Sequence, residues 1–135
     1  GCVVGLHYHL HQADYWYVPI GTCRVVLHDL RVGSPTDGAT QVIDIGARAD
    51  GTHDHRGIFI PPGVAHGFAS LTDMTITYLV DSYYNPKDEL GLAYNDKAVK
   101  ADWGIAKPIL SDRDAANPTR DAIDSQVRPF WPMRT

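Results

Sequence analysis

The most regular alternation of hydrophobic and polar positions lies near the start of the chain, in residues 5–11. As a β-strand, this stretch places His7, His9 and His11 on one face and its leucine and tyrosine side chains on the other. Each imidazole has a donor and an acceptor that need partners, so three rings against an aliphatic core would be costly. We therefore predict that the histidines line a polar cavity. A solvated outer strand is the alternative.

Short β-rich runs separated by turn signals fill the first two thirds of the chain. Further strands are predicted over residues 14–20, 22–32, 40–45, 56–60, 65–70 and 74–81. Clusters of Gly, Pro, Asp and Ser separate these runs and favour turns. Because no helical pattern lies between the strands, the sequence predicts an all-β sandwich or barrel.

The pattern changes after Tyr84. Asn85 and Pro86 open a turn, residues 97–104 are compatible with a helical turn, and residues 111–114 begin a capped polar segment. Residues 130–132 are predicted to dock the tail onto the body of the protein or onto a partner subunit. This third of the chain is expected to be irregular and partly helical, and to wrap around the β-structure.

The 135 residues suit a single domain, residues 1–135, with 44% hydrophobic and 21% charged positions. A net charge of −4 without a run of basic residues argues against a nucleic-acid partner. No apolar run approaches the length of a membrane span and no signal segment opens the chain, so we expect a cytoplasmic protein without a membrane partner. Cys2 and Cys23 lack metal-type spacing, and a disulfide between them stays open.

One set of motifs favours a metal site. Gly1, His7, His9, Asp14 and Gly21 have the spacing of the first cupin motif, and residues 61–66 resemble the second motif, which ends in His66. Two imidazoles from one strand, a carboxylate and a third imidazole suit Mn, Fe, Ni or Zn. On this interpretation the protein is a metal-dependent dioxygenase or isomerase. Asp14 stands where that motif has a longer Glu.

A second set of motifs covers nearly the whole chain. It comprises, in order, residues 5–8, 29–31, 33–36, 60–68, Tyr78 with Tyr84, 95–96 and 110–114. Over residues 3–118 the chain resembles the dTDP-4-dehydrorhamnose 3,5-epimerase family. The resemblance implies a cupin-type jelly roll, a homodimer, a dTDP-sugar substrate and no metal or other cofactor. The family's N-terminal segment has no counterpart, so the sequence is expected to be part of a longer chain.

The resemblance also implies roles for individual residues. His7 matches the catalytic base, Asp114 its carboxylate partner and Tyr78 the acid on the opposite face of the sugar. Tyr84 matches the position near the nucleotide, and His66 a histidine that lines the site. A carbonyl at C4 of the sugar acidifies the hydrogens at C3 and C5, which a neutral imidazole can remove.

The chain departs from the family at three basic positions. Val4 and Tyr17 replace arginines, and Asp14 replaces a lysine expected to stabilise the enolate oxygen. Loss of one such donor costs about a hundredfold or more in rate. We expect His9, His11, Arg24 or a bound metal to compensate, or the ligand to differ. Candidate substrate-binding residues are therefore His66, Tyr84, His9 and Arg24.

Three alternatives remain open from the sequence. The protein could be a non-catalytic sugar-binding cupin. Tyr78 shares a face with Met74 and Ile76, which also suits a core tyrosine with a satisfied hydroxyl. Asp114 could instead be a surface carboxylate beside Arg113 or Arg120.

Overall fold

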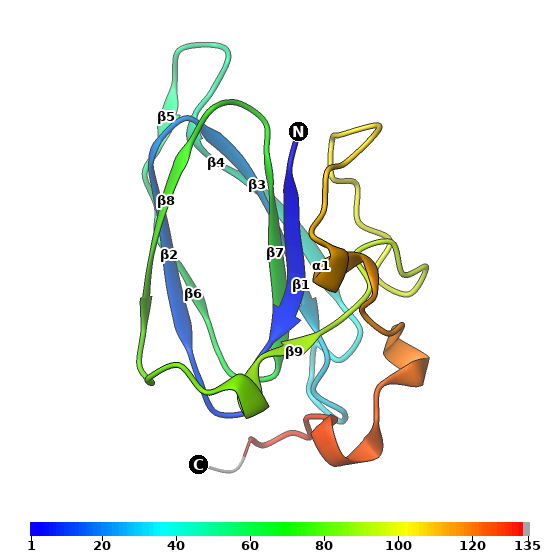
Figure 1. Ribbon diagram of the computed structural model, residues 1–135. Helices are drawn as coiled ribbons and strands as arrows, with labels where there is room; N and C mark the ends of the chain where they lie inside the picture. Colours follow the sequence, from blue (N-terminus) through cyan, green and yellow to red (C-terminus); the bar gives the residue numbers. More distant parts are fainter. Residues whose placement is uncertain (134–135) are drawn as a thin grey trace.

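The computed structural model describes residues 1–133 and consists of two antiparallel β-sheets that face each other (Figure 1). The larger sheet has the strand order β5-β4-β3-β7-β1-β9, and the smaller has the order β6-β2-β8. The larger sheet contains β1 (Val3–Tyr8), β3 (Thr22–Asp29), β4 (Thr40–Ala47), β5 (His53–Asp54), β7 (Val64–Ser70) and β9 (Leu90–Gly91). The smaller contains β2 (Asp14–Ile20), β6 (Ile58–Ile60) and β8 (Thr75–Val80).

One hydrophobic core lies between the two sheets. Alternate side chains of each strand point inward, as the period of two along a β-strand requires. The buried members of this core are Trp16, Val18, Cys23, Val25, Ile45, Ile58, Ile60 and Val64. This core fills part of the space between the sheets and leaves the rest free for polar side chains.

A second core lies on the outer face of the larger sheet, which the C-terminal third covers (Figure 1). Leu6, Tyr8 and Val26 from the strands pack there against Leu92 and Trp103 from the covering segment. This segment contains the short helices η1 (Pro86–Asp88), α1 (Asp112–Ala115), η2 (Arg120–Ala122) and η3 (Ser125–Val127). Since this sheet is covered on both faces, every residue of β3 and β7 is buried or half-buried.

The all-β prediction is confirmed, and each predicted strand is present with bounds shifted by a few residues. The capped segment at residues 111–114 is helix α1, in which the Ser111 hydroxyl accepts a hydrogen bond from the Asp114 amide at 3.1 Å. The turn predicted within residues 97–104 is present as a single helical turn, in which the Asp96 carbonyl accepts from the Val99 and Lys100 amides at 3.0 and 3.2 Å, and residues 100–104 continue as irregular chain. Strands β5 and β9, each two residues long, were too short to leave a pattern in the sequence.

The tail docks onto the body of the protein, the first of the two alternatives. The Trp131 amide donates to the Val32 carbonyl at 2.9 Å, and the Arg31 guanidinium lies 4.8 Å from the centre of the Trp131 ring. Arg31 is held in turn by the Asp29 carboxylate. Burial opposes ionisation of Asp29, but hydrogen bonds from Arg31 and from nearby hydroxyls outweigh it and lower its pKa.

Cys2 is an exposed free thiol and Cys23 is a buried free thiol, so the two cysteines do not form a disulfide with each other. Within residues 1–133, no helix has the length and apolar character needed to cross a membrane.

Candidate active site

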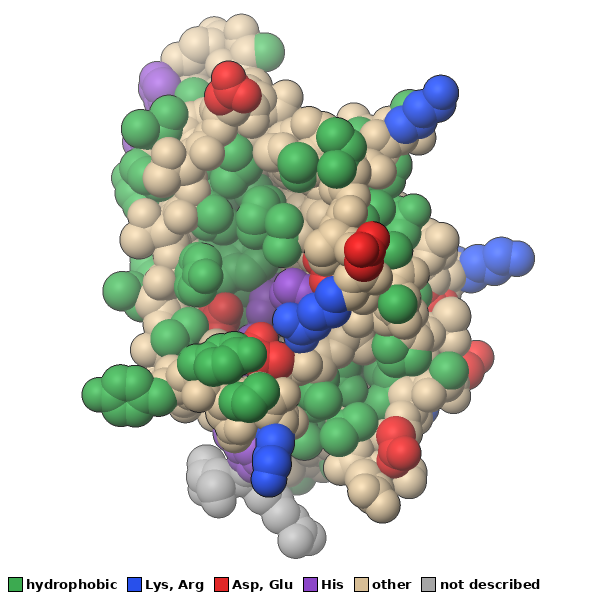
Figure 2. Space-filling model, in the orientation of Figure 1, with side chains coloured by type: hydrophobic (Ala, Val, Ile, Leu, Met, Phe, Trp, Pro, Cys, Tyr) green, Lys and Arg blue, Asp and Glu red, His purple; other side chains and the backbone are tan. Residues whose placement is uncertain are grey.

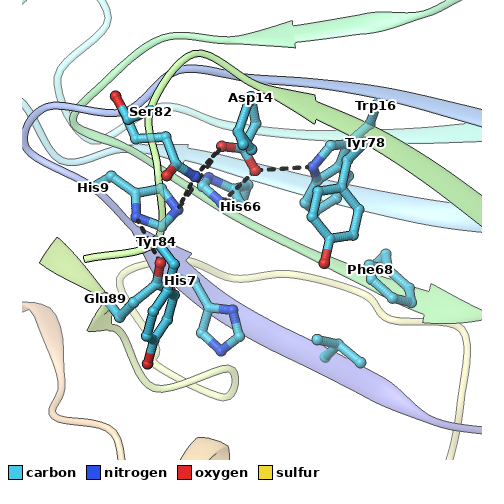
Figure 3. A pocket seen from close by; sticks show the side chains of 13 residues that line it. His7, His9, Asp14, Trp16, His66, Phe68, Tyr78, Ser82, Tyr84 and Glu89 are labelled. Carbon is cyan, nitrogen blue, oxygen red and sulfur yellow. Dashed lines mark hydrogen bonds and ion pairs between the residues drawn. The ribbon is translucent and has the colours of Figure 1, made fainter. Parts of the chain in front are cut away.

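A cavity of about 420 Å³ opens between the two sheets, in the space that the inter-sheet core leaves free. In the space-filling view, histidine side chains lie at the bottom of a hollow bordered by hydrophobic side chains (Figure 2). The lining side chains come from both sheets and from the segment after β8 (Figure 3). They include His7, His9, Asp14, Trp16, His66, Phe68, Tyr78, Tyr84 and Glu89.

The histidine strand lines this cavity only in part. His7 and His9 face the cavity as predicted, whereas His11 is exposed and lies outside the lining. Strand β1 ends at Tyr8, and the Asp88 carboxylate then accepts hydrogen bonds from the backbone amides of Leu10 and His11, at 2.6 and 3.1 Å. The prediction for His11 is therefore wrong, because this remote carboxylate ends the alternation.

His7 and Asp114 form the shortest polar contact of the site. The His7 Nε2 atom lies 2.6 Å from Asp114 Oδ1, and the other carboxylate oxygen accepts the Gly5 amide at 3.0 Å. Asp114 is buried, which opposes its ionisation. The hydrogen bonds from Gly5 and His7 outweigh this burial and lower its pKa below the usual value. The structure thus pairs Asp114 with His7 and not with Arg113 or Arg120.

A glycine in β1 makes this pairing possible. The strand register shifts between Val4 and His7, which marks a β-bulge around Gly5. Gly5 has φ 113°, and a Cβ atom there would lie 2.8 Å from the Gly67 Cα atom. The bulge places both Val4 and His7 on the cavity side and exposes the Gly5 amide to Asp114.

His9, His66 and Asp14 form a buried cluster beside His7. The Asp14 carboxylate lies 3.9 Å from His9 Nε2 and 3.7 Å from His66 Nε2. It accepts hydrogen bonds from Gln12 at 2.9 Å and from the Trp16 indole at 3.2 Å. Burial lowers the pKa of His66 to about 4, against the opposing effects of the Val64 carbonyl and Asp14.

Tyr78 faces His7 from the opposite sheet. It lies on β8 beside Trp16 of β2, and 61% of its surface is exposed. Ile76 on the same face packs into the inter-sheet core, but Tyr78 lies two residues further along, where the cavity opens. Tyr78 is thus a cavity residue and not a core tyrosine. Tyr84 lines the cavity from the loop after β8 and is 78% exposed.

Arg24 does not line the cavity, contrary to our expectation. It lies on the outer face of β3, where its guanidinium binds the Asp44 carboxylate at 2.7 and 3.0 Å. Cys23, Val25 and Leu27, at the alternate positions, are β3 residues that face the smaller sheet. Among the described residues, no Lys or Arg side chain lines the cavity.

The three departures from the family pattern lie in different surroundings. Val4 and Asp14 line the cavity, so their side chains stand where basic ones were expected. Tyr17 lies outside the lining, with its hydroxyl 3.5 Å from His55 Nδ1.

Sequence reasoning missed several residues at or near the site. Trp16 follows Asp14 by two positions on β2, so the period of two could have placed it in the cavity. Gln12 and Glu89 lie outside regular strands, where no periodic signal exists. Arg113 donates to the carbonyl of the lining residue Glu89 at 2.9 Å and so lies at the cavity rim.

The chain is similar to known proteins in sequence and in fold. Residues 1–121 match the family described as dTDP-4-dehydrorhamnose 3,5-epimerase. A Mycobacterium tuberculosis protein of that name is 36% identical over 97% of this chain and 66% of its own length. A Shigella flexneri protein of the same name is 32% identical over 84% of this chain and 62% of its own length. The chain therefore spans slightly less than two thirds of these curated relatives.

Two solved structures show the same fold. The Legionella pneumophila RmlC epimerase in complex with dTDP-4-keto-L-rhamnose superposes with a TM-score of 0.85 at 32% identity, covering 97% of this chain and 69% of that one. The Mycobacterium tuberculosis rmlC epimerase gives a TM-score of 0.88 at 35% identity, covering 97% and 67%. The predicted cupin-type fold is confirmed by these similarities.

Proposed function

The chain belongs to the dTDP-4-dehydrorhamnose 3,5-epimerase family, and we propose that it epimerises a dTDP-linked 4-keto-6-deoxyhexose at C3, C5 or both. The observation that carries the proposal is the 2.6 Å contact between His7 and Asp114 at the wall of a cavity large enough for a sugar. The Legionella relative, which is bound to a dTDP-keto-sugar, supports this class of substrate.

In the proposed reaction, His7 is the base. Its Nε2–H donates to the Asp114 carboxylate, so Nδ1 carries the lone pair that removes the proton next to the C4 carbonyl. The carboxylate holds this tautomer and stabilises the imidazolium that forms. Asp114 is in turn fixed by the Gly5 amide and by its place in helix α1.

Tyr78 is proposed to return a proton from the opposite face. It comes from the smaller sheet whereas His7 comes from the larger one, so a sugar bound between them meets one residue on each side. Delivery of a proton to the face opposite the one that lost it inverts the carbon centre. The phenol is mostly exposed, which gives it access to solvent protons.

The remaining lining residues are proposed to bind the substrate. His66 and His9 form the inner wall and Tyr84 the outer edge, where a nucleotide would leave the cavity. A positive charge at the rim from Arg113 suits a diphosphate. Because Arg24 is paired with Asp44 outside the cavity, we no longer propose it as a substrate-binding residue.

The test is proton NMR of dTDP-4-keto-6-deoxyglucose in D2O with the protein. Loss of the C3 or C5 proton signal is the expected result, and the signal that fades identifies the reacting centre. His7→Asn should abolish this exchange, whereas His11→Asn, at an exposed position, should retain it. Binding of the sugar nucleotide without exchange, in the wild type with or without added divalent metal, would favour a non-catalytic sugar-binding cupin.

A homodimer is the proposed assembly. On the outer face of the smaller sheet, Tyr15 pairs with Phe59 on one side and with Leu79 on the other, and all three are exposed. Such an apolar group on adjacent strands suits a subunit interface. In sedimentation velocity, Phe59→Lys should yield monomers and Val42→Lys, on the other sheet, should not; a monomeric wild type would refute the proposal.

A cytoplasmic location stays a prediction. Two free thiols are compatible with a reducing compartment.

A further inference from the structure

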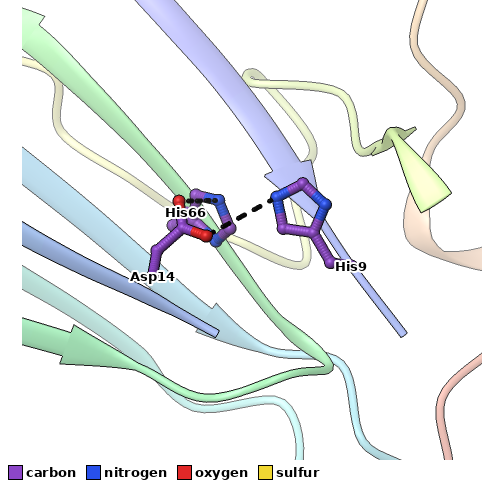
Figure 4. A group of neighbouring side chains, drawn as sticks. All are labelled: His9, Asp14 and His66. Carbon is purple, nitrogen blue, oxygen red and sulfur yellow. Dashed lines mark ion pairs between the residues drawn. The ribbon is translucent and has the colours of Figure 1, made fainter. Parts of the chain in front are cut away.

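Three electron-pair donors converge on one point in the cavity wall. Nitrogen atoms of His9 and His66 and a carboxylate oxygen of Asp14 all lie within 4.8 Å of one another (Figure 4). His9 and Asp14 lie at the two ends of the connection between β1 and β2, His66 lies on β7, and each of the three is more than nine-tenths buried. A buried group of this composition needs a positive charge to offset the carboxylate.

Backbone contacts hold both imidazole rings in the orientation that a metal ligand needs. The Nδ1 atom of His9 lies 2.7 Å from the Asp88 carbonyl oxygen, and the Nδ1 atom of His66 lies 2.9 Å from the Val64 carbonyl oxygen. A carbonyl only accepts hydrogen bonds, so both Nδ1 atoms carry the proton. Both Nε2 lone pairs therefore point toward Asp14, and fixing the second ring nitrogen in this way is the usual support of a metal-bound histidine.

We propose that His9 Nε2, His66 Nε2 and the Asp14 carboxylate bind one divalent first-row transition metal ion. Two histidines and one carboxylate form the facial set that leaves further coordination positions open. Metal–ligand bonds of about 2.1 Å would place neighbouring donor atoms about 3.0–3.5 Å apart. His9 Nε2 now lies 3.9 Å from Asp14 Oδ1 and His66 Nε2 3.7 Å from Oδ2, with all three donor atoms within 4.8 Å of one another, so metal binding requires the side chains to close around the ion.

Two neighbouring side chains fit this assignment. The Trp16 indole donates to Asp14 Oδ2, the oxygen that lies 3.7 Å from His66 Nε2, and so orients the carboxylate. The Gln12 amide nitrogen lies 2.9 Å from Asp14 and 3.4 Å from His9 Nε2, between two of the ligands. On metal binding, this amide swings away or turns its oxygen toward the ion. His7 is not part of the set, because its Nε2 is bound to Asp114.

The position of the ion gives it a role that rests on the proposed epimerase function. Asp14 stands where the family resemblance implies a lysine for the enolate oxygen, and this cavity lacks a lining Lys or Arg within the described part of the chain. An ion held by Asp14 restores a positive charge at this point, where it can polarise the C4 carbonyl oxygen of the sugar. The inference departs from the metal-free reaction that the resemblance implies.

The primary test uses Co²⁺ as a spectroscopic probe. Protein freed of metal with EDTA and then dialysed is titrated with CoCl2, and one equivalent should produce a saturable visible d–d band. Asp14→Asn and His66→Gln should each weaken binding by about a hundredfold or more. His55→Gln is the matched control, because His55 is exposed and stacks on His53 away from the cavity. No binding, or binding unchanged in Asp14→Asn, would overturn the proposal.

A measurement on the wild type covers the case in which these variants fail to fold. Imidazole nitrogen spectra recorded with Zn²⁺ should show shifts of Nε2 in His9 and His66 and no direct coordination of His7. Coordination by His7 instead would overturn the assignment.

The proton-exchange assay separates this inference from the proposed function. Exchange that persists in EDTA, together with no Co²⁺ binding, would remove the metal site and leave the epimerase proposal standing. Co²⁺ binding without proton exchange of the keto-sugar under any condition would support the metal site and contradict the epimerase proposal.

Discussion

His7 and Asp114 stand 107 residues apart in the sequence and 2.6 Å apart in the structure. Their contact joins the strand at the start of the chain to a helix near its end. The Gly5 amide binds the second oxygen of the same carboxylate. The carboxylate is thus held on both oxygens, and the imidazole that it orients faces the cavity.

Asp114→Asn tests this contact. An amide at this position can offer its NH2 group to Nε2, which favours the wrong tautomer and no longer stabilises the imidazolium. We expect the exchange rate of the keto-sugar to fall by about a hundredfold or more, with the fold retained. Asp112→Asn, an exposed neighbour in the same helix, should keep the wild-type rate. An unchanged rate in Asp114→Asn would remove this residue from the reaction.

Tyr78→Phe separates the two halves of the proposed reaction. His7 can still remove the proton and return one to the same face, so solvent exchange should continue. Inversion of the centre should slow by about a hundredfold, because the opposing donor is gone. NMR in D2O measures exchange and epimer formation in one sample. Tyr83→Phe, at a 99% exposed position, serves as the control, and equal loss in both variants would contradict the assignment.

Gly5→Ala should destabilise the protein more than an ordinary glycine substitution. An added Cβ would meet both the Gly67 Cα atom and the His66 carbonyl oxygen at 2.8 Å, on a backbone with φ 113°. We expect a loss of about 3 kcal/mol or more in urea unfolding. Gly38→Ala has a positive φ of 78° but open space around it, and should cost about 1 kcal/mol. Similar losses in the two variants would argue against a steric role for Gly5.

His28 makes stability depend on pH. The Thr40 hydroxyl donates to the Val99 carbonyl, so His28 Nδ1–H donates to Thr40, and Nε2 accepts from Arg120. Burial, followed by the charge of Arg120, lowers the pKa of His28 below its ordinary value of 6.5. Nearby carboxylates offset part of this shift.

The sign of this dependence follows from the lowered pKa. Below pH 6.5 the unfolded chain binds a proton that the folded protein resists, so the free energy of unfolding falls as pH falls. The contribution of His28 is bounded by about 1.4 kcal/mol for each pH unit in that interval. Urea unfolding between neutral and mildly acidic pH should show a smaller slope for His28→Gln than for the wild type. His53→Gln, at an exposed position, should keep the wild-type slope.

Strand alternation explains what could be predicted from the sequence. It placed His7 and His9 on one face of the first strand, because a period of two is a local property. It also separated Arg24 from Cys23 and Val25. Alternation does not tell which face of a strand meets the second sheet, and Arg24 lies on the face covered by the C-terminal segment.

Contacts remote in sequence explain the rest. His11 does not follow the alternation, because its amide binds Asp88, 77 residues away. Gln12 lines the cavity from the connection between β1 and β2, which has no periodic pattern of side chains. Motif resemblance supplied what local patterns could not, namely that Asp114 and Tyr78 belong beside His7. The observed pairing of Asp114 with His7 agrees with this resemblance, and the catalytic roles of Asp114 and Tyr78 stay predictions.

The contact of Asp114 with His7 in the first strand, 107 residues earlier in the sequence, has a consequence for how the protein folds. Closing so long a loop is slow compared with forming a hairpin, because the chain loses conformational entropy before the contact that offsets this loss has formed. His7 can acquire its partner Asp114 only when the last third of the chain has packed across the larger sheet. After dilution from denaturant, recovery of the proposed proton exchange should therefore coincide with the slowest refolding phase, so this exchange would report the finished fold.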